Sequence, residues 1–500
     1  MASKVKINFG SCCEAIADAR FFLLKDETSA LPDEVRENFQ KAISSERFSN
    51  KPGATKIYFR ENEDLVIVSL GGKSKNETSK KCTKELETDN LRLAVAKVME
   101  IARAEKYETI VIHVYETGLS NALIAKTVSE MVGFHSYIFD RYKSDKKPLD
   151  LKNVSILTDE NKDTQEAEEA IKEALLLANS VNITRYLVDE PALKMYPKTL
   201  ADYVADLGKK TGFEVEIKDK EEIEKLKMTS FLAVAKGSPR EPKLIIMRYK
   251  GDPKSEKTLG LVGKGLTYDT GGLSIKPTSS MLDMKSDMAG AAAVIGAINA
   301  AAEAKLKINI TGIVAACENA LGGASYKPGD IVTTMAGKTI SVINTDAEGR
   351  LTLVDALYYA ATVEKVDKII DLATLTGAAI VALGTLCSAS MTNNEDFFQD
   401  FKTAAKTAGE KTWQLPLYSE YVEHIKHKES DYVNSTTPGS GAPGSIVAGL
   451  LLQEFVENKP WIHVDIAGPS FLSSAKTYYA QGATGYGVKT LYELFKTINQ

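Results

Sequence analysis

Apolar residues occur along this chain in two patterns, and each pattern predicts a different kind of element. In the first third, short apolar runs predict strands, and apolar positions spaced by three or four residues predict helices between them. Strands are expected at 4–9, 55–59, 65–70, 109–115 and 154–157, and helices at 89–104 and 120–132. This alternation is typical of an α/β module of roughly 150 residues.

From about Asn182 onward the pattern is more regular, and the apolar runs are rich in β-branched residues, as buried strands are. Strands are expected at 244–249, 258–266, 308–316, 339–343, 368–372 and 461–466, with Ala-rich helices at 289–303, 352–363 and 444–456. This order predicts a second sheet, mixed or mostly parallel, with helices on both faces. In such sheets the ligand lies at the carboxyl ends of the strands.

The 500 residues therefore predict an α/β protein of two domains, each with a mixed or mostly parallel sheet flanked by helices. A charged helix begins near Asp163, after a stretch rich in Lys, Asp and Pro, and serves as the predicted connector. We expect an N-terminal α/β domain at 1–160, a connecting helix at 161–181 and a C-terminal domain that carries the site at 182–500.

Composition narrows the class of protein. The 62 basic and 67 acidic residues give a net charge of −5, which offers no support for nucleic-acid binding. The five cysteines include no CxxC pair, so neither a disulfide framework nor a thiolate zinc site is indicated. The N-terminus lacks the apolar core of a signal peptide, and no apolar run is long enough to span a bilayer. We expect a reduced, cytoplasmic protein with no membrane partner.

The most informative stretch is 344–351, with the sequence Asn-Thr-Asp-Ala-Glu-Gly-Arg-Leu. In an extended segment Asp346, Glu348 and Arg350 share one face. Burying two carboxylates and a guanidinium on one face destabilises the fold unless a ligand binds there. Carboxylates suit hard divalent cations, and Arg suits small oxyanions. The alternative interpretation is a solvated turn, because Asn, Asp and Gly favour turns.

A second group of charged residues follows the strand predicted at 258–266. Lys264, Asp269 and Lys276 lie at the strand end or in the Gly-rich loop after it, and Asp287 precedes the helix predicted at 289–303. An N-cap is the alternative role for Asp287. The Gly-Lys-Gly sequence at 263–265 is weak evidence for a dinucleotide site, because the third Gly and the immediate helix are missing.

If the sheet brings these strand ends together, four carboxylates meet in one crevice. They would repel and take up protons unless cations neutralise them. Two divalent metals do this, and paired metals suit hydrolysis. None of the five His has HExxH spacing, and lone residues such as His113 and His135 are more often packed than ligating. A metallohydrolase here must therefore be rich in carboxylate ligands.

At this point the chain resembles the leucyl aminopeptidases of the M17 (cytosol aminopeptidase) family. The octet at 344–351 matches the family signature at all eight positions, and the stretches 264–276 and 283–290 match in order and spacing. Further matching stretches are 315–319, 328–331, 372–378 and 465–468. The resemblance covers roughly 182 to the C-terminus, whereas the N-terminal domain resembles the family only in size and α/β character. Departures at Asp189 and at 320–323 touch none of the expected metal positions.

The resemblance implies a role for each matched residue. Lys264, Asp269, Asp287 and Glu348 would bind one metal, and Asp269, Asp346 and Glu348 the other, so Asp269 and Glu348 would bridge two Zn²⁺ or Mn²⁺ ions per subunit. As a ligand, Lys264 must be uncharged. Lys276 would stabilise the oxyanion that develops from the substrate, and Arg350 would hold a bicarbonate that moves protons.

The resemblance also implies a substrate and an assembly. Peptides with a free N-terminus would bind one metal through their α-amine, which explains exopeptidase action. Met284, Thr374 and Gly377 match positions that shape an apolar pocket for a Leu- or Met-like first residue or hold the peptide backbone. Family members form homohexamers. The rival hypotheses are a non-catalytic or DNA-binding regulatory protein on the same scaffold, and a nucleotide-binding protein that uses the Gly-Lys-Gly loop.

Overall fold

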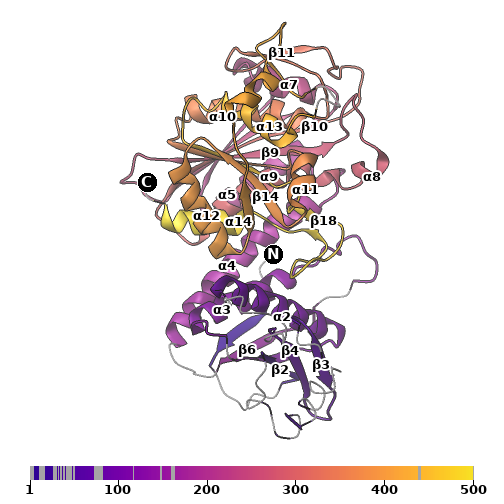
Figure 1. Ribbon diagram of the computed structural model, residues 1–500, viewed down its shortest axis with the longest axis vertical. Helices are drawn as coiled ribbons and strands as arrows, with labels where there is room; N and C mark the ends of the chain where they lie inside the picture. Colours follow the sequence, from indigo (N-terminus) through magenta and orange to yellow (C-terminus); the bar gives the residue numbers. More distant parts are fainter. Residues whose placement is uncertain are drawn as a thin grey trace. The chain divides into compact units, whose positions relative to one another are not determined.

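The computed structural model divides the chain into two compact units, each of which is α/β as predicted (Figure 1). One unit is Met1–Asn182 with Ala475–Ala480, and the other is Ile183–Ser474 with Gln481–Gln500. The predicted domain limits at 160 and 182 stay a prediction. The residues described are 5–10, 17–25, 31, 33, 36–37, 40, 48, 51–71, 83–115, 117–146, 149–158, 164–436 and 441–498.

The first unit contains a six-stranded sheet in the order β1-β6-β5-β2-β4-β3. All neighbouring strands are parallel except the antiparallel pair β3 and β4. The strands are β1 (Lys6–Phe9), β2 (Ala19–Leu24), β3 (Thr55–Tyr58), β4 (Asp64–Ser69), β5 (Thr109–Val114) and β6 (Asn153–Thr158). The described helices are α2 (Lys84–Ala104), α3 (Asn121–His135) and α4 (Thr164–Asp189), whose last residues, from Ile183, belong to the second unit.

Every strand and helix predicted for this unit is present among the described residues, with ends that differ by a few positions. Lys4 and Asp163, at predicted ends, lie outside the described residues. Sequence reasoning missed β2, which lies between β5 and β4 in the sheet. The β2 residues, Ala-Arg-Phe-Phe-Leu-Leu, form a short apolar run whose periodicity does not distinguish a strand from a buried helical turn. Pro191 follows Glu190, and α4 ends at Asp189 because the residue before a proline disfavours the α conformation.

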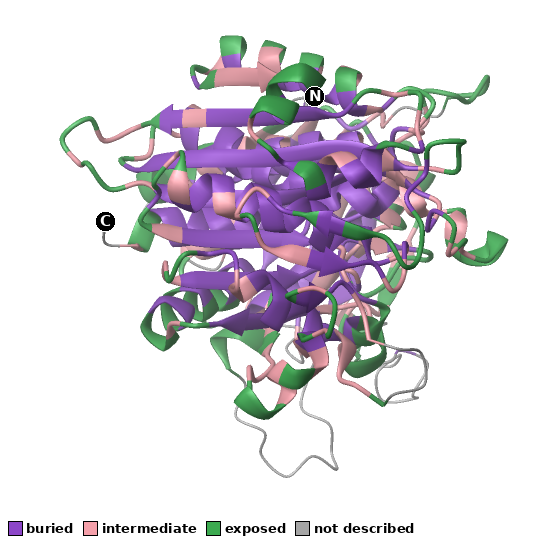
Figure 2. Cartoon of the chain, turned by 90° about the horizontal axis from the view of Figure 1, so that it is seen from above, coloured by how far each residue is buried: buried purple, intermediate pink, exposed green. Residues whose placement is uncertain are grey.

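The second unit is built on an eight-stranded mixed sheet in the order β15-β14-β17-β13-β9-β10-β8-β7. Its centre is parallel: β17, β13, β9 and β10 run in the same direction. The strands of this sheet are β7 (Glu214–Lys218), β8 (Lys243–Lys250), β9 (Leu259–Asp269), β10 (Asn309–Asn319), β13 (Lys368–Ala373), β14 (Cys387–Thr392), β15 (Lys411–Gln414) and β17 (Trp461–Asp465). Figure 2 shows that these central strands are buried along most of their length.

Two groups of helices pack on this sheet. Helix α10 (Glu348–Thr362) packs against β9, β10 and β13 together with α7 (Thr229–Ala235) and α13 (Gly444–Gln453), and these elements share one apolar core. Helix α9 (Ala289–Glu303) contacts the same strands together with α5 (Pro197–Thr211) and α14 (Val488–Thr497). Helix α9 matches its predicted limits, which follow from its eight alanines in fifteen residues.

Smaller elements complete the unit. They are α6 (Lys220–Lys225), α8 (Thr278–Met281), the 3-10 helix η1 (Met284–Met288), β11 (Ile331–Thr333), β12 (Thr339–Ser341), α11 (Gly377–Leu383), α12 (Glu395–Ala408), η2 (Ser419–Ile425), β16 (Tyr432–Val433), β18 (Phe471–Leu472) and β19 (Gly482–Ala483). All six strands predicted for this unit are present, whereas β7, β11, β14, β15, β16, β18 and β19 were not predicted. No described helix has the length and apolarity needed to cross a membrane. Cys317 and Cys387 are free thiols, and the other three cysteines lie outside the described residues.

Candidate metal centre

The carboxyl end of β9 supplies two of the predicted site residues through an irregularity in the strand. Lys264 and Asp269 are five residues apart, so a regular strand would point them to opposite faces. The pairing of β9 with β10 shifts, however: Leu266 is opposite Cys317, whereas Tyr268 is opposite Glu318. Thr267 is the extra residue, and it restores Asp269 to the face of Lys264.

The stretch 344–351 folds differently from the extended segment that the sequence suggested. The backbone turns at Asn344, whose Oδ1 accepts a hydrogen bond of 2.8 Å from Asp346 N, and α10 begins at Glu348. That prediction was wrong because the period-two spacing of the charges did not detect the start of the helix. An acidic residue in the first turn is favoured by the helix dipole. Glu348 and Arg350 are both buried, so the solvated-turn interpretation is also excluded.

Asp287 lies in η1 and does not cap helix α9, whose N-cap is Met288 without a side-chain hydrogen bond. Its Oδ1 instead accepts hydrogen bonds from Lys264 Nζ at 2.8 Å and Thr374 Oγ1 at 2.7 Å. Lys264 Nζ also donates to the carbonyl oxygen of Thr374, which follows β13, at 2.8 Å. The N-cap interpretation of Asp287 is therefore wrong, and Asp287, Lys264 and Thr374 belong to one cluster.

The two lysines connect the four carboxylates. Lys264 Nζ lies 2.8 Å from Asp287 Oδ1 and 2.9 Å from Glu348 Oε1. Lys276 Nζ lies 2.9 Å from Asp269 Oδ2 and 2.5 Å from Asp346 Oδ1. Gly349 makes room for Lys264, because a Cβ at position 349 would lie 2.5 Å from Lys264 Cε. Four carboxylates against two ammonium groups leave an excess of negative charge in a buried place, which favours cation binding.

Burial shifts the ionisation of these groups. It raises the pKa of Glu348 to about 8 and that of Asp287 to about 6, and in both cases Asp269 adds repulsion. Burial also raises the pKa of Asp346. Burial alone would lower the pKa of Lys264, but Asp287 and Glu348 outweigh it, so the pKa is raised. Without a cation the centre therefore holds protons that a cation would displace.

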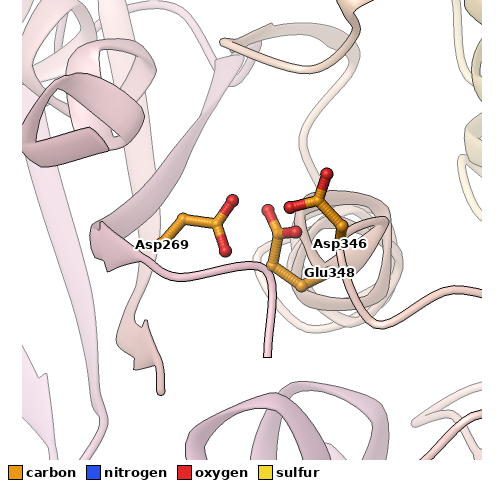
Figure 3. Close-up of side chains that lie close together, drawn as sticks. All are labelled: Asp269, Asp346 and Glu348. Atoms are coloured by element: carbon orange, nitrogen blue, oxygen red, sulfur yellow. The ribbon is translucent and has the colours of Figure 1, made fainter. Parts of the chain in front are cut away.

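The carboxylates offer unused ligand atoms. Asp269, Asp346 and Glu348 each present an atom within 4.8 Å of the others, and Figure 3 shows the three carboxylates pointing toward one another. Among the described residues, Asp287 Oδ2 and Glu348 Oε2 are buried without a hydrogen-bond partner. Buried polar atoms without partners are rare and call for a ligand. An all-oxygen set of this kind, with one amine beside it, fits a pair of divalent cations.

The other predicted residues lie around this cluster. Arg350 is in the first turn of α10, and burial lowers its pKa to about 10 although Glu348 and Asp465 oppose the shift. Its Nε has no hydrogen-bond partner in the described part of the chain, which suits an anion. Met284 begins η1 and is half-buried, and Gly377 begins α11 and is exposed.

Sequence reasoning assigned no role to three buried residues that support the centre. Asn319 Nδ2 donates to Asp269 Oδ1 at 2.7 Å, and Tyr326 Oη donates to the carbonyl oxygen of Thr345 at 2.7 Å. Asn434 donates to the carbonyl oxygen of Asn344 at 2.6 Å and accepts from Ile343 N at 2.7 Å. Asn319 ends the stretch 315–319 that resembles the family, which was a signal without a role attached, whereas Tyr326 and Asn434 lie in no matched stretch and only the tertiary structure reveals their contacts.

The Gly-Lys-Gly sequence at 263–265 does not form a phosphate-binding loop. These residues lie inside β9 and are paired with Val314, Ala315 and Ala316 of β10. Their backbone groups belong to the sheet, and Lys264 is held by Asp287 and Glu348. The nucleotide-binding hypothesis therefore loses the feature on which it rested.

Comparison with known proteins agrees with this geometry. The catalytic domain of the cytosol aminopeptidase family matches residues 182–492. The N-terminal domain of the same family matches residues 23–146, so the relationship extends over a region that carries no recognisable motif.

Relatives and solved structures cover almost the whole chain. The probable cytosol aminopeptidase of Clostridium perfringens is 46% identical over 86% of each chain, and that of Alkaliphilus oremlandii is 40% identical over 99% of this chain and 100% of its own. A tomato leucine aminopeptidase mutant superposes with a TM-score of 0.85 at 33% identity, covering 99% of this chain and 97% of that chain. The bottromycin maturation enzyme BotP in complex with Mn gives a TM-score of 0.82 at 29% identity, covering 96% and 99%. The chain therefore belongs to the cytosol aminopeptidase family.

Proposed function

We propose that this chain, a metal-dependent aminopeptidase by family, removes Leu-like residues from the free N-terminus of peptides at the centre formed by β9, η1 and α10. The observation that carries the proposal is the convergence of Asp269, Asp346 and Glu348, with ligand atoms within 4.8 Å of one another, beside the buried Lys264 and the half-buried Lys276. Hydrolysis of an amide needs an activated water and a stabilised oxyanion, and this set of residues can provide for both.

The assignment of the metal-holding residues follows the family resemblance, and their contacts support it. We assign Lys264, Asp269, Asp287 and Glu348 to one cation and Asp269, Asp346 and Glu348 to the other. Two divalent cations held there supply a water of lowered pKa, polarisation of the scissile carbonyl and an anchor for the free α-amine of the substrate. Lys264 must give up its proton to act as a ligand, and Asp287 and Glu348 must be ionised.

Lys276 and Arg350 act beside the metals. Lys276 Nζ lies between Asp269 and Asp346, where an ammonium group can stabilise negative charge that develops on the carbonyl oxygen of the substrate. Arg350 offers to a small oxyanion a buried Nε that has no hydrogen-bond partner among the described residues, and we assign bicarbonate to it. An anion at Arg350 can accept the proton released by the attacking water and pass it to the leaving amine.

The substrate side is formed by Met284, Thr374 and Gly377. Met284 is half-buried in η1 and offers a flexible apolar side chain for the first residue of the peptide. Thr374 is anchored to Asp287, and the exposed Gly377 leaves room for the peptide backbone. This combination favours a Leu- or Met-like first residue.

Three further assignments follow from the family. We propose Zn²⁺ or Mn²⁺ as the metals, since carboxylate and amine ligands suit both and since the similar enzyme BotP was solved with Mn. We also propose a homohexamer that acts in the cytoplasm. A non-catalytic or DNA-binding protein on this scaffold is not favoured, because every charged position expected for catalysis is filled.

The test is hydrolysis of leucine amide and of N-acetyl-leucine amide by the purified protein. Each is assayed after chelation and after readdition of Mn²⁺ or Zn²⁺. Metal-restored cleavage of the free-amine substrate alone is the expected result. No cleavage despite two bound ions per chain would favour the non-catalytic scaffold. No cleavage and no bound metal would refute the metal assignment itself.

A further inference from the structure

Asn319 contacts both segments that carry aspartates of the metal centre, the end of β9 and the turn before α10. It is the last residue of β10 and is completely buried. Its Nδ2 donates to Asp269 Oδ1 at 2.7 Å and to the carbonyl oxygen of Thr345 at 3.0 Å. Both partners are acceptors, so the amide must present its NH₂ group to them. One side chain thus connects the end of β9 to the turn that carries Asp346.

The shift in strand pairing places Asn319 where it can make these contacts. After the extra residue Thr267, the pairing resumes with Asn319 directly opposite Asp269. The backbone of Asn319 contributes as well, because its carbonyl oxygen accepts hydrogen bonds from Thr270 N and Thr270 Oγ1, both at 2.9 Å. The start of the Gly-rich loop is therefore fixed to the same residue.

The space around the amide is tightly filled. Gly272 has a φ of +62°, and a Cβ at this position would lie 2.9 Å from Asn319 Oδ1. Any larger side chain at 272 would push the amide away from Asp269. Thr345 is held from the other side by Tyr326, whose hydroxyl donates to the same carbonyl oxygen.

The consequence concerns the two oxygens of Asp269. Oδ1 accepts hydrogen bonds from Asn319 Nδ2 and from Gly271 N at 2.9 Å, whereas Oδ2 faces Lys276 Nζ. An oxygen with two donors is a poorer metal ligand than its neighbour, so the amide selects Oδ2 for the centre. We infer that Asn319 is a positioning residue that orients the Asp269 carboxylate and sets its distance from Asp346 and Glu348 before any cation binds.

This inference rests on the proposed function, and a pair of variants tests it. Asn319→Leu keeps the number and branching of the side-chain heavy atoms, although its methyl groups are bulkier than the amide, and it removes both hydrogen bonds. Tyr326→Phe is the matched control, because it removes the other donor to Thr345 without touching Asp269. Partners that orient metal ligands contribute about 10- to 100-fold to metal affinity. Asn319→Leu should weaken binding of Mn²⁺ by that factor in calorimetry, and Tyr326→Phe should change it by less than about threefold.

A kinetic readout separates positioning from a structural role. Excess free Mn²⁺ should restore much of the activity of Asn319→Leu, since the ligands remain and only their orientation is lost. Asn319→Ser, which also fails to reach Asp269 but keeps a polar group, serves if the leucine variant does not fold. Circular dichroism and the melting temperature report on folding in each case.

Several results would overturn the inference. If either folded Asn319 variant bound Mn²⁺ as tightly as the parent protein, the amide would not position Asp269. An equal loss of Mn²⁺ affinity in Tyr326→Phe would show that the effect arises from the turn at Thr345 and not from the contact with Asp269. Failure of both Asn319 variants to fold would make the residue part of the structural core. If the parent protein itself bound no metal, the proposed function would fail, and that result is distinct from all of these.

Discussion

Metal binding at this centre should be strongly dependent on pH, because cations compete with protons that burial has stabilised. The ionised carboxylates bind, and burial raises the pKa of Glu348 to about 8 and that of Asp287 to about 6. The contribution of these two carboxylates to the affinity is therefore complete above these values and is lost as the pH falls through them. One pKa unit corresponds to about tenfold in binding. Between pH 8 and pH 6, protonation of Glu348 should weaken metal binding by about 50-fold and protonation of Asp287 by about a further twofold. Together they should weaken it by about 100-fold.

Lys264 adds to this dependence if it acts as a ligand. Its pKa is raised by Asp287 and Glu348, so it carries a proton throughout this range and must release it on binding. That release contributes about another tenfold per pH unit. At pH 7 the chain should therefore release about two protons as the centre fills, about one from Glu348 and about one from Lys264.

Calorimetry in buffers of different ionisation enthalpy counts these protons directly. The titration is run with Mn²⁺ on chelator-treated protein at pH 6, 7 and 8. Lys264→Met serves as the matched variant, and it should release about one proton fewer than the parent. An affinity that stayed constant from pH 6 to pH 8 would refute the reasoning, as would parent and variant releasing equal numbers of protons.

Three further changes test the other assignments. Lys276→Met should lower kcat by about 10²- to 10³-fold in steady-state kinetics, because it removes the ammonium group beside the developing oxyanion. Metal analysis of this variant should still find two ions per chain. An unchanged kcat would contradict the role of Lys276. Arg350→Ala should reduce the rate without loss of metal, and loss of both ions on elemental analysis would make Arg350 structural instead. Asp355→Ala should lower the free energy of unfolding in urea by about 2 to 5 kcal/mol, because it leaves the buried Phe231 N and Met335 N without their acceptor. A midpoint equal to that of the parent would show that water replaces the carboxylate.

The charged residues of the site were predictable because their chemistry is unusual in buried surroundings. Asp269, Asp287, Asp346 and Glu348 follow or precede apolar segments, and the rule that ligands lie at strand ends was enough to gather them. The confirmed strands and the limits of α9 show that apolar periodicity predicts the central strands of the second unit's sheet, which are β8, β10, β9, β13 and β17.

The conformations of these residues were less predictable. Glu348 and Arg350 were expected on one face of an extended segment, but they lie in the first turn of α10. Spacing alone could not distinguish the two, because charges at alternate positions fit a strand and also fit a helix start whose carboxylate faces the dipole. Asp287 has the sequence position of an N-cap, and only the fold brings Lys264 and Thr374 to its oxygen.

The supporting residues could not be predicted from the sequence. Asn319 and Tyr326 contact Asp269 and Thr345 from distant positions along the chain. Asn319 ends the stretch 315–319 that resembles the family, but that match assigned it no role, and Tyr326 belongs to no matched stretch. Their roles depend on the pairing of β9 with β10 and on the course of the loop after Asn319. Such contacts are properties of the tertiary structure.

The extra residue in β9 also determines which changes of length this strand can accept. Lys264 and Asp269 are separated by an odd number of positions, which is compatible with a shared face only while Thr267 remains an insertion. Deletion of Thr267 would leave an even separation in a regular strand, so both side chains would keep their face and Asp269 would still lie opposite Asn319. Deletion of a residue outside the irregularity, with Thr267 still unpaired, would instead turn the carboxylate to the other face of the sheet. A designer who transfers the two residues to a regular strand must therefore separate them by an even number of positions.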